Sequence, residues 1–306
     1  MARALAAILY LLPRRVLLSF ARFLGWAAYH LCAKDRGKAL RNLKLAYGDT
    51  KAESEIRSIT KKVFENLAQT TLEMVQFPKL NSEKVENFVE IGKAYDVYSD
   101  LLSEGKGLIA LTSHIGNWEL LGGIFTMKGF KGKAIAKEIY YAPYNRWIEG
   151  LRSSLKIQTI YRDQSSREIL TWLAGGGLIG ILPDQDISAL KGVFVDFFGT
   201  PAYTPASPVR LSLTSGAPIL PIFLIREPND RYRIVMGKVI RPVIKTTRQD
   251  AVLEYTRQWM ASCESAIRQH PEQWAWMHNR WKTKKDEIET DRTNLDGIGK
   301  LNGCPS

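Results

Sequence analysis

Cysteine and histidine are both scarce in this chain. Its 306 residues include three cysteines, Cys32, Cys263 and Cys304, which lie far apart in the sequence. Such an odd and widely spaced set does not indicate a disulfide framework, so we expect a reducing compartment. The four histidines show no metal-ligand spacing, and we therefore expect no bound metal ion.

The signatures of several common enzyme classes are absent as well. The chain has no G-x-S-x-G nucleophile elbow, which disfavours a serine hydrolase of that kind. It has no Walker A motif and no dinucleotide-binding fingerprint, and we expect no cofactor. Internal repeats and low-complexity linkers are also missing. The composition is that of a globular protein long enough for one large domain with short additions.

Two apolar stretches open the chain, but neither is an uncharged run of about 20 residues. They cover residues 4–12 and 16–33, and Arg22 interrupts the second. No small-residue cleavage site follows the first stretch, so a cleaved signal peptide is not expected. We expect residues 1–48 to form an uncleaved membrane-anchoring segment that either spans the bilayer or, as we favour, lies in the interface. A buried core helix is the alternative.

Acidic residues are rare in this same segment, although the whole chain carries a net charge of +12. Residues 1–48 hold nine Lys and Arg against the single acid Asp35, which accounts for +8 of the total. Basic residues among aliphatic and aromatic ones suit an anionic membrane surface. We see no nucleic-acid-binding motif, so we expect no nucleic-acid partner. The basic residues after Ala33 predict that the following domain faces the cytoplasm.

From residue 49 to residue 285, helical and strand patterns alternate. Apolar runs predict strands at 107–112, 134–136, 158–161, 178–182, 218–225 and 232–239. Three- and four-residue periodicity predicts helices at 51–76, 144–155, 166–173, 208–215 and 249–269. This alternation predicts an α/β fold, a mixed central sheet with helices on both faces. Residues 286–306 are expected to form a loosely ordered tail.

The first catalytic candidate follows the strand at 107–112. His114 lies at the turn after it, and Glu119 lies in the first turn of the next predicted helix. A histidine held at the rim of a sheet and oriented by a carboxylate has the chemistry of a general base. The alternative is an ordinary turn histidine beside a glutamate that favours the helix dipole.

Three segments resemble the lipid A late acyltransferases, a family that also includes mannoside and other glycolipid acyltransferases. TSHIGNWELLGG around His114 resembles the H-x-x-x-x-D/E motif of glycerolipid and lipid A acyltransferases, in its glutamate form. PDQD at 183–186 followed by GVFVDFFGTPA at 192–202 resembles the centre of the family. PEQWAWMHNRWK at 271–282 resembles its closing tryptophan-rich motif. The resemblance extends from about Pro13 to about Lys284.

This resemblance implies a glycerolipid acyltransferase-like fold and a place in lipopolysaccharide biosynthesis at the bacterial inner membrane. The donor would be an acyl thioester, with acyl carrier protein favoured over coenzyme A. The acceptor would be a hydroxyl of a lipid A precursor, deprotonated by His114 with Glu119 orienting the imidazole. Another glycolipid or lysophospholipid acceptor is the alternative. A catalytically silent membrane-binding protein is the alternative outside the enzymes.

Six further residues are candidates for substrate binding. An arginine near His114 is suited to grip a phosphate or a developing oxyanion, and Arg152 is the first candidate, with Arg162 as its competitor. The 192–202 segment is suited to lining an acyl-chain groove, and a place in the core is the alternative. Carboxylates after the strand at 178–182 lie where α/β sheets keep their sites. The full set is Arg152, Arg162, Asp184, Asp186, Asn117 and Arg280.

Overall fold

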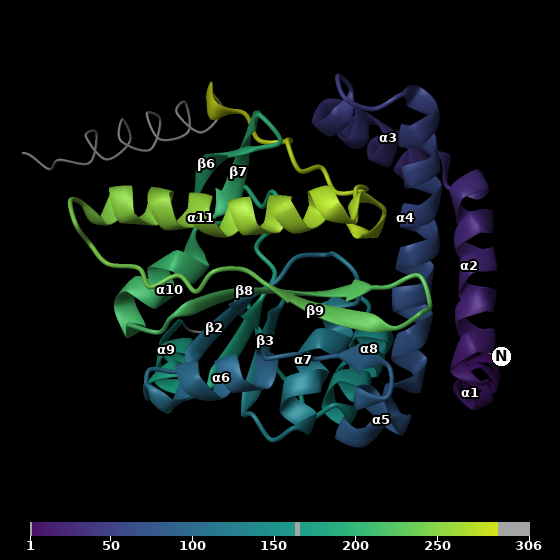
Figure 1. The fold of residues 1–306 in the computed structure, drawn as a ribbon, viewed down its shortest axis with the longest axis horizontal. Helices are drawn as coiled ribbons and strands as arrows, with labels where there is room; N and C mark the ends of the chain where they lie inside the picture. Colours follow the sequence, from purple (N-terminus) through teal and green to yellow (C-terminus); the bar gives the residue numbers. More distant parts are fainter. Residues whose placement is uncertain (1, 163–165, 287–306) are drawn as a thin grey trace, which may run out of the picture.

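Seven strands form the central sheet of the computed structural model, which describes residues 2–162 and 166–286 (Figure 1). They are β1 (Val89–Glu90), β2 (Leu108–Leu111), β3 (Gly132–Ala136), β4 (Gln158–Tyr161), β5 (Leu178–Ile181), β8 (Ile219–Arg226) and β9 (Tyr232–Met236). Their order is β1-β9-β8-β2-β5-β3-β4, and only the β8–β9 pair within this sheet is antiparallel. The central strands β2 and β8 are buried and, apart from Arg226 at the end of β8, apolar, as strands covered on both faces are.

Helices cover both faces of this sheet. One face carries α5 (Ser82–Glu86), α6 (Ala94–Ser103), α7 (Trp118–Met127) and α8 (Ala142–Ser154). The other carries α9 (Ser166–Ala174), α10 (Ser207–Ser215) and α11 (Arg248–Gln269), and α11 crosses above the sheet in Figure 1. Alternate residues of β2 belong to the two opposite cores, Ile109 to one and Ala110 to the other. The expected mixed sheet with helices on both faces is confirmed.

Four helices open the chain: α1 (Ala2–Leu11), α2 (Arg14–Leu31), α3 (Ala33–Tyr47) and α4 (Glu53–Glu73). Helix α2 lies alongside α4 and buries Leu17, Leu18 and Ala21 (Figure 1). Within the described residues, no single helix has the length and composition to cross a bilayer, and α2 with α3 meets that test only as a pair bent by 90°. The expected N-terminal anchoring helix is therefore not supported as one apolar span.

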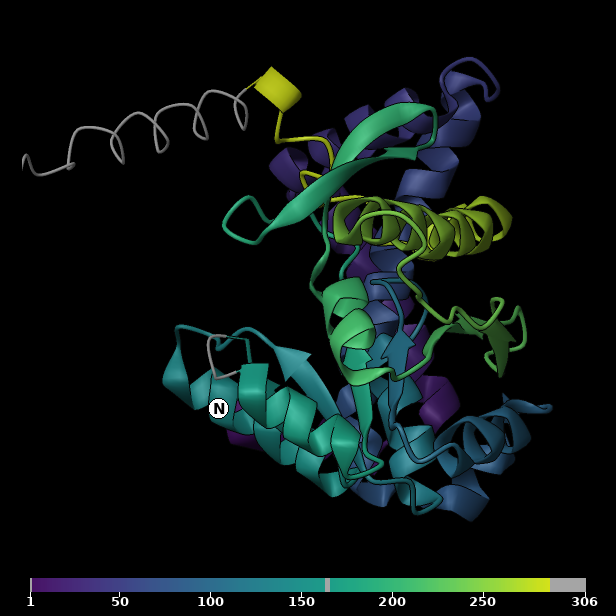
Figure 2. The ribbon, with the colours of Figure 1, turned by 90° about the vertical axis from the view of Figure 1, so that its left-hand side faces the viewer.

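The aromatic segment at 192–202 is a β-hairpin, where we expected a loop lining an acyl-chain groove. Strands β6 (Gly192–Phe197) and β7 (Thr200–Pro205) pair antiparallel and are joined by Phe198 and Gly199. Both joining residues have positive φ, as a two-residue hairpin turn matched to strand twist requires. The hairpin packs on α11 (Figure 2), and its aromatic side chains Phe197 and Phe198 are buried. Residues 192–202 therefore build core, whereas Pro205 at the end of β7 lines a groove.

Most other boundaries match the predicted ones closely. The helix predicted over 51–76 leaves the α conformation at Glu73 and continues as the 3₁₀ helix η1 (Met74–Lys79), which contains Pro78. A second short 3₁₀ helix, η2 (Pro271–Gln273), opens the tryptophan-rich segment. Cys32 and Cys263 are both free thiols. Cys304 lies outside the described residues, and so does the predicted tail at 286–306 apart from Asp286.

Candidate active site

His114 and Asp184 meet because their strands are neighbours in register. Leu111 at the end of β2 is paired with Ile181 at the end of β5, and each catalytic candidate lies three residues further along its own chain segment. His114 Nδ1 lies 2.8 Å from Asp184 Oδ1, and the His114 backbone N–H donates to Oδ2 at 2.8 Å. The Trp274 indole N–H also donates to Oδ2, at 2.9 Å. The carboxylate is thus buried, satisfied and fixed.

The electrostatics of this pair suit a base. Burial of His114 disfavours its charged form, but the Asp184 carboxylate beside it outweighs this and raises the pKa of His114 above its ordinary value. Burial likewise opposes ionisation of Asp184, yet His114 holds the pKa of Asp184 far below its usual range. Because Nδ1–H points to the carboxylate, the neutral imidazole presents the Nε2 lone pair away from Asp184.

Gln185 and His278 lie against the His114 imidazole: the Gln185 amide nitrogen is 3.4 Å from Nδ1, and the two histidine ring centres are 5.0 Å apart. The Gln185 side-chain amide nitrogen is 3.2 Å from His114 Nε2 and 3.1 Å from His278 Nε2. Burial is the main cause that lowers the pKa of His278 to about 4, and the nearby His114 lowers it further. His278 is therefore neutral at neutral pH. We did not predict either residue as part of the site. The available signal was their place in the PDQD and tryptophan-rich segments.

Glu119 does not orient His114 as we expected. Its two carboxylate oxygens accept hydrogen bonds from Arg152, with Nε to Oε2 at 2.9 Å and Nη2 to Oε1 at 2.7 Å. Glu119 lies in the first turn of α7, and Arg152 lies in the last turn of α8, where the two helix dipoles favour a negative and a positive charge respectively. The orienting carboxylate on the imidazole is Asp184 instead.

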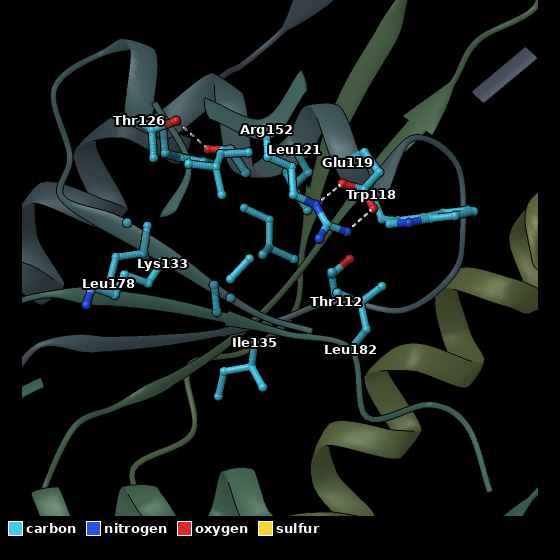
Figure 3. Close-up of a pocket in the computed structure, with 18 of the residues that line it drawn as sticks. Thr112, Trp118, Glu119, Leu121, Thr126, Lys133, Ile135, Arg152, Leu178 and Leu182 are labelled. Carbon is cyan, nitrogen blue, oxygen red and sulfur yellow. Dashed lines mark hydrogen bonds and ion pairs between the residues drawn. The ribbon is translucent and has the colours of Figure 1, made fainter. Parts of the chain in front are cut away.

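A groove of about 440 Å³ runs past His114, and a smaller apolar cavity of about 90 Å³ adjoins it. Six residues line both spaces: Trp118, Glu119, Ile135, Ala136, Arg152 and Leu182. Figure 3 shows the Glu119–Arg152 pair near Thr112 and Leu182, with Leu178 and Lys133 toward the other end of the cavity. The ion pair therefore lies where the groove that contains His114 passes into an apolar space between α7 and β3.

The turn that carries His114 is held by its backbone. Gly116 has a φ of 60°, and a Cβ there would approach the Leu224 carbonyl oxygen to 1.9 Å, so only glycine fits. Its N–H donates to the Gln273 carbonyl at 3.2 Å, and the Asn117 N–H donates to the Leu224 carbonyl at 3.0 Å. The Asn117 side chain then caps α7 by accepting the Leu120 N–H at 3.0 Å.

The six substrate-binding candidates divide into two groups. Arg152 and Arg162 line the groove as expected. Asp184, Asn117 and Arg280 are fully buried, and none of them lines the groove. Arg280 donates to the Tyr203 carbonyl and to Thr204 Oγ1, both at 2.6 Å. These three side chains are committed to protein partners, so they do not reach a substrate in this structure.

Asp186, the sixth candidate, faces the C-terminal segment. It accepts the Thr283 backbone N–H at 2.7 Å and the Thr283 hydroxyl at 2.6 Å, which fixes the chain after the tryptophan-rich segment. It does not line the groove. Asp184, Asp186 and Arg280 thus act in this structure through the protein, and not through a direct contact with the groove.

Comparison with known proteins assigns a family to this arrangement. A family model described as bacterial lipid A biosynthesis acyltransferase matches residues 1–283. A phosphatidylinositol mannoside acyltransferase of Mycobacterium tuberculosis is 25% identical over 73% of this chain and 69% of that protein. The lipid A biosynthesis lauroyltransferase of Escherichia coli is 24% identical over 83% of this chain and 82% of its own length. The lipid A biosynthesis palmitoleoyltransferase of the same organism is 22% identical over 89% and 87%.

Proposed function

Because this chain belongs to the bacterial lipid A biosynthesis acyltransferase family and transfers acyl groups, we propose a specific reaction for it. In this reaction it moves a fatty acyl chain from an acyl thioester to a hydroxyl of a lipid A precursor. The observation that carries the proposal is His114, which is oriented by a buried carboxylate and presents Nε2 to a groove that continues into an apolar cavity. A base, a cleft that carries cationic side chains and an apolar space are what acyl transfer to a lipid needs.

In the proposed reaction the acceptor hydroxyl takes the place of the Gln185 amide against His114 Nε2. The hydroxyl proton passes to Nε2 while its oxygen attacks the thioester carbonyl carbon. The tetrahedral intermediate then collapses, the carbon–sulfur bond breaks, and the imidazolium returns the proton to the leaving thiolate. Asp184 stabilises the imidazolium and holds the imidazole in the required tautomer. No covalent acyl-enzyme is needed.

Arg152 is the donor that we favour for the developing oxyanion. The backbone N–H groups of Gly116 and Asn117 at the start of α7 already donate to carbonyl groups of the protein. Arg152 lines the groove, and Glu119 fixes its guanidinium through two hydrogen bonds. A guanidinium held in advance of the reaction stabilises new negative charge without reorganising. Glu119 therefore serves catalysis through Arg152 in this proposal.

The apolar cavity next to this pair is the proposed site of the acyl chain. Most of its lining is aliphatic or aromatic, with Thr126 and Lys133 as polar residues away from the Glu119–Arg152 end. Its small volume means that the chain enters by displacing side chains or extends partly into the groove. Several lining positions are glycine, and side chains built there would shorten the space.

The donor and the acceptor are proposed on chemical grounds. Acyl carrier proteins are acidic, and the net charge of +12 favours their docking. The groove also carries Arg162 and Lys137, which suit the phosphates of a lipid A precursor. A phosphatidylinositol mannoside or another glycolipid is the second candidate acceptor, because a relative named phosphatidylinositol mannoside acyltransferase is 25% identical to this chain.

We also propose that the chain binds the bacterial inner membrane from the cytoplasmic side. Large apolar side chains are exposed on α1 and α2, including Leu11, Phe20, Phe23 and Trp26, among the basic residues of segment 1–48. Such a surface suits an interfacial position with the domain at 49–285 beside the lipid. Co-sedimentation with anionic vesicles tests this, and a Phe23→Glu/Trp26→Glu variant is expected to remain in the supernatant. Binding equal to that of the unaltered chain would overturn the proposal.

A panel of acceptors tests the reaction. The purified protein is incubated with labelled acyl donor and, separately, a lipid A precursor, a phosphatidylinositol mannoside and a lysophospholipid, with mass spectrometry of the products. We expect the lipid A precursor to be acylated fastest, with acyl carrier protein preferred over coenzyme A as the donor. Faster acylation of either other lipid would reassign the acceptor.

A further inference from the structure

Glu73, at the end of α4, is a buried carboxylate shared by four side chains from distant parts of the chain. Arg14 Nε donates to Oε1 at 2.7 Å, and Arg14 Nη2 lies 2.6 Å from the same oxygen. On Oε2, Glu73 accepts from Arg226 Nη2 at 2.9 Å, from Asn117 Nδ2 at 3.1 Å and from the Tyr232 hydroxyl. We call these five residues the Glu73 cluster.

The cluster is charged and its centre is buried, while the Arg14 side chain at its edge is 23% exposed. Glu73 is 5% exposed and Arg226 is 6% exposed. Burial alone would raise the pKa of Glu73, but Arg226 and Arg14 outweigh it and hold that pKa below its ordinary value. A buried carboxylate with two guanidinium partners is tolerated only while every partner stays in place. Loss of one partner is therefore expected to disturb the contacts of Glu73 with its remaining partners.

One member of the cluster belongs to the catalytic turn. Asn117 lies three residues after His114 and two before Glu119, and its side-chain oxygen caps α7. Its amide nitrogen donates to Glu73 and lies 3.1 Å from the Tyr232 hydroxyl oxygen. Glu73 thus holds the turn between His114 and the Glu119–Arg152 pair through the Asn117 side chain, which does not line the groove.

Another member belongs to the N-terminal segment. Arg14 is the first residue of α2, and its guanidinium lies 4.4 Å from the centre of the Phe88 ring. A second ion pair, between Arg22 and Asp230 at 3.0 Å, ties the same helix to the turn between β8 and β9. Arg15, next to Arg14, is exposed and does not belong to the cluster. Helix α2 therefore reaches behind the active site through Arg14.

We propose that Arg14 and Glu73 are positioning residues for catalysis, so that the N-terminal helix is part of the catalytic apparatus as well as a membrane-binding element. This proposal rests on the proposed function, since its main readout is acyl transfer. Docking of α2 places the Arg14 guanidinium on Oε1 of Glu73, Glu73 holds Asn117 through Oε2, and Asn117 fixes the start of α7. When the docking fails, the separation between His114 Nε2 and the Glu119–Arg152 pair is no longer fixed.

The matched pair Arg14→Gln and Arg15→Gln tests this role. Each removes one positive charge from the same end of α2, and the exposed Arg15 is the one better placed to attract an anionic surface. Acyl transfer is measured with detergent-dispersed acceptor, where membrane recruitment does not limit the rate. We expect Arg14→Gln to lower kcat by about 10- to 100-fold with little change in KM, as misplaced catalytic groups do. Arg15→Gln is expected to stay within about twofold of the unaltered chain.

A second readout is independent of turnover. Amide hydrogen exchange of the 113–120 peptide is expected to accelerate in Arg14→Gln and to stay unchanged in Arg15→Gln, with global unfolding at similar denaturant in both. Arg14→Lys, which keeps charge and loses the fork, is expected to fall between them. Equal kcat for the two glutamine variants, or unchanged exchange at 113–120 in Arg14→Gln, would overturn the proposal. An inactive unaltered chain would instead count against the proposed function, while the exchange experiment would still test the cluster.

Discussion

Asp184 holds both the side chain and the backbone of His114, through Oδ1 to Nδ1 and through Oδ2 to the amide nitrogen, each at 2.8 Å. One carboxylate therefore fixes the position, the rotation and the tautomer of the imidazole together. This relationship makes Asp184, and not Glu119, the partner of the proposed base, and it leads to the first two predictions.

Asp184→Asn should lower kcat about as much as loss of a positioned base, by about 10²–10⁴-fold. The asparagine amide cannot stabilise an imidazolium and favours the wrong tautomer. Asp186→Asn is the matched control, because Asp186 contacts Thr283 and does not line the groove. Steady-state kinetics on both variants, with folding checked by circular dichroism, measure this. Similar kcat values for Asp184→Asn and the unaltered chain would exclude the pair from the mechanism.

The pH profile should show an acid limb set by His114. A general base works in its unprotonated form, so kcat/KM falls as the pH drops through the pKa of His114 in the folded protein. Asp184 raises that pKa above its ordinary value, so the limb should lie above about pH 6.5. His278 does not contribute there, because its pKa is about 4. In Asp184→Asn the limb should move to lower pH, and a limb that stays in place would contradict this assignment.

Arg152 and Glu119 should behave as one unit. Arg152→Ala is expected to be nearly inactive and Arg152→Lys partly active, because lysine keeps the charge but loses the two-pronged contact with Glu119. Glu119→Ala releases the guanidinium and should also lower kcat strongly, and the double alanine variant should cost less than the product of the two. Arg162→Ala should be milder. If the two losses in kcat multiplied fully in the double variant, the two residues would act independently, contrary to this prediction.

Acyl-chain length should respond to Gly180, which lines the apolar cavity in β5. A Cβ built there meets only the Lys133 carbonyl oxygen, at 3.9 Å, so Gly180→Val adds volume with little clash. Competition between donors of different chain length, read by mass spectrometry, should show a shift toward shorter chains. Gly150→Ala in α8, where a Cβ meets nothing within 4 Å, is the control. An unchanged preference in Gly180→Val would place the acyl chain elsewhere.

Local sequence patterns were enough to predict most of the fold. Periodicity located strands such as β4 (Gln158–Tyr161) and the long helix α11, and the alternation of the two predicted the layered sheet. The β6–β7 hairpin was missed because its turn uses Phe198 and Gly199, and a phenylalanine with positive φ carries no recognisable turn signal. The helix predicted over 51–76 ends earlier, at Glu73. Pro78 lacks a backbone N–H and also disfavours the α conformation in the residue before it, so the last turn becomes a 3₁₀ helix.

The site was only partly predictable, for a different reason. His114 was identified from its place after a buried strand, which is a local feature. Its partner depends on strand order, because Asp184 reaches it only when β5 lies next to β2. The short separation of five residues favoured Glu119 as the partner of His114, but helix α8 brings Arg152 to the Glu119 carboxylate instead. Contacts between elements distant along the chain are set by packing, and spacing does not report them.

The most direct test of this account is single-turnover transfer from acyl carrier protein to a lipid A precursor, comparing the unaltered chain with His114→Ala. We predict stoichiometric appearance of the acylated lipid with the unaltered chain. With His114→Ala, folded by circular dichroism, we predict a rate about 10²–10⁴-fold lower. No acyl intermediate on the protein should accumulate in either case. Transfer at a near-normal rate by His114→Ala would contradict the account.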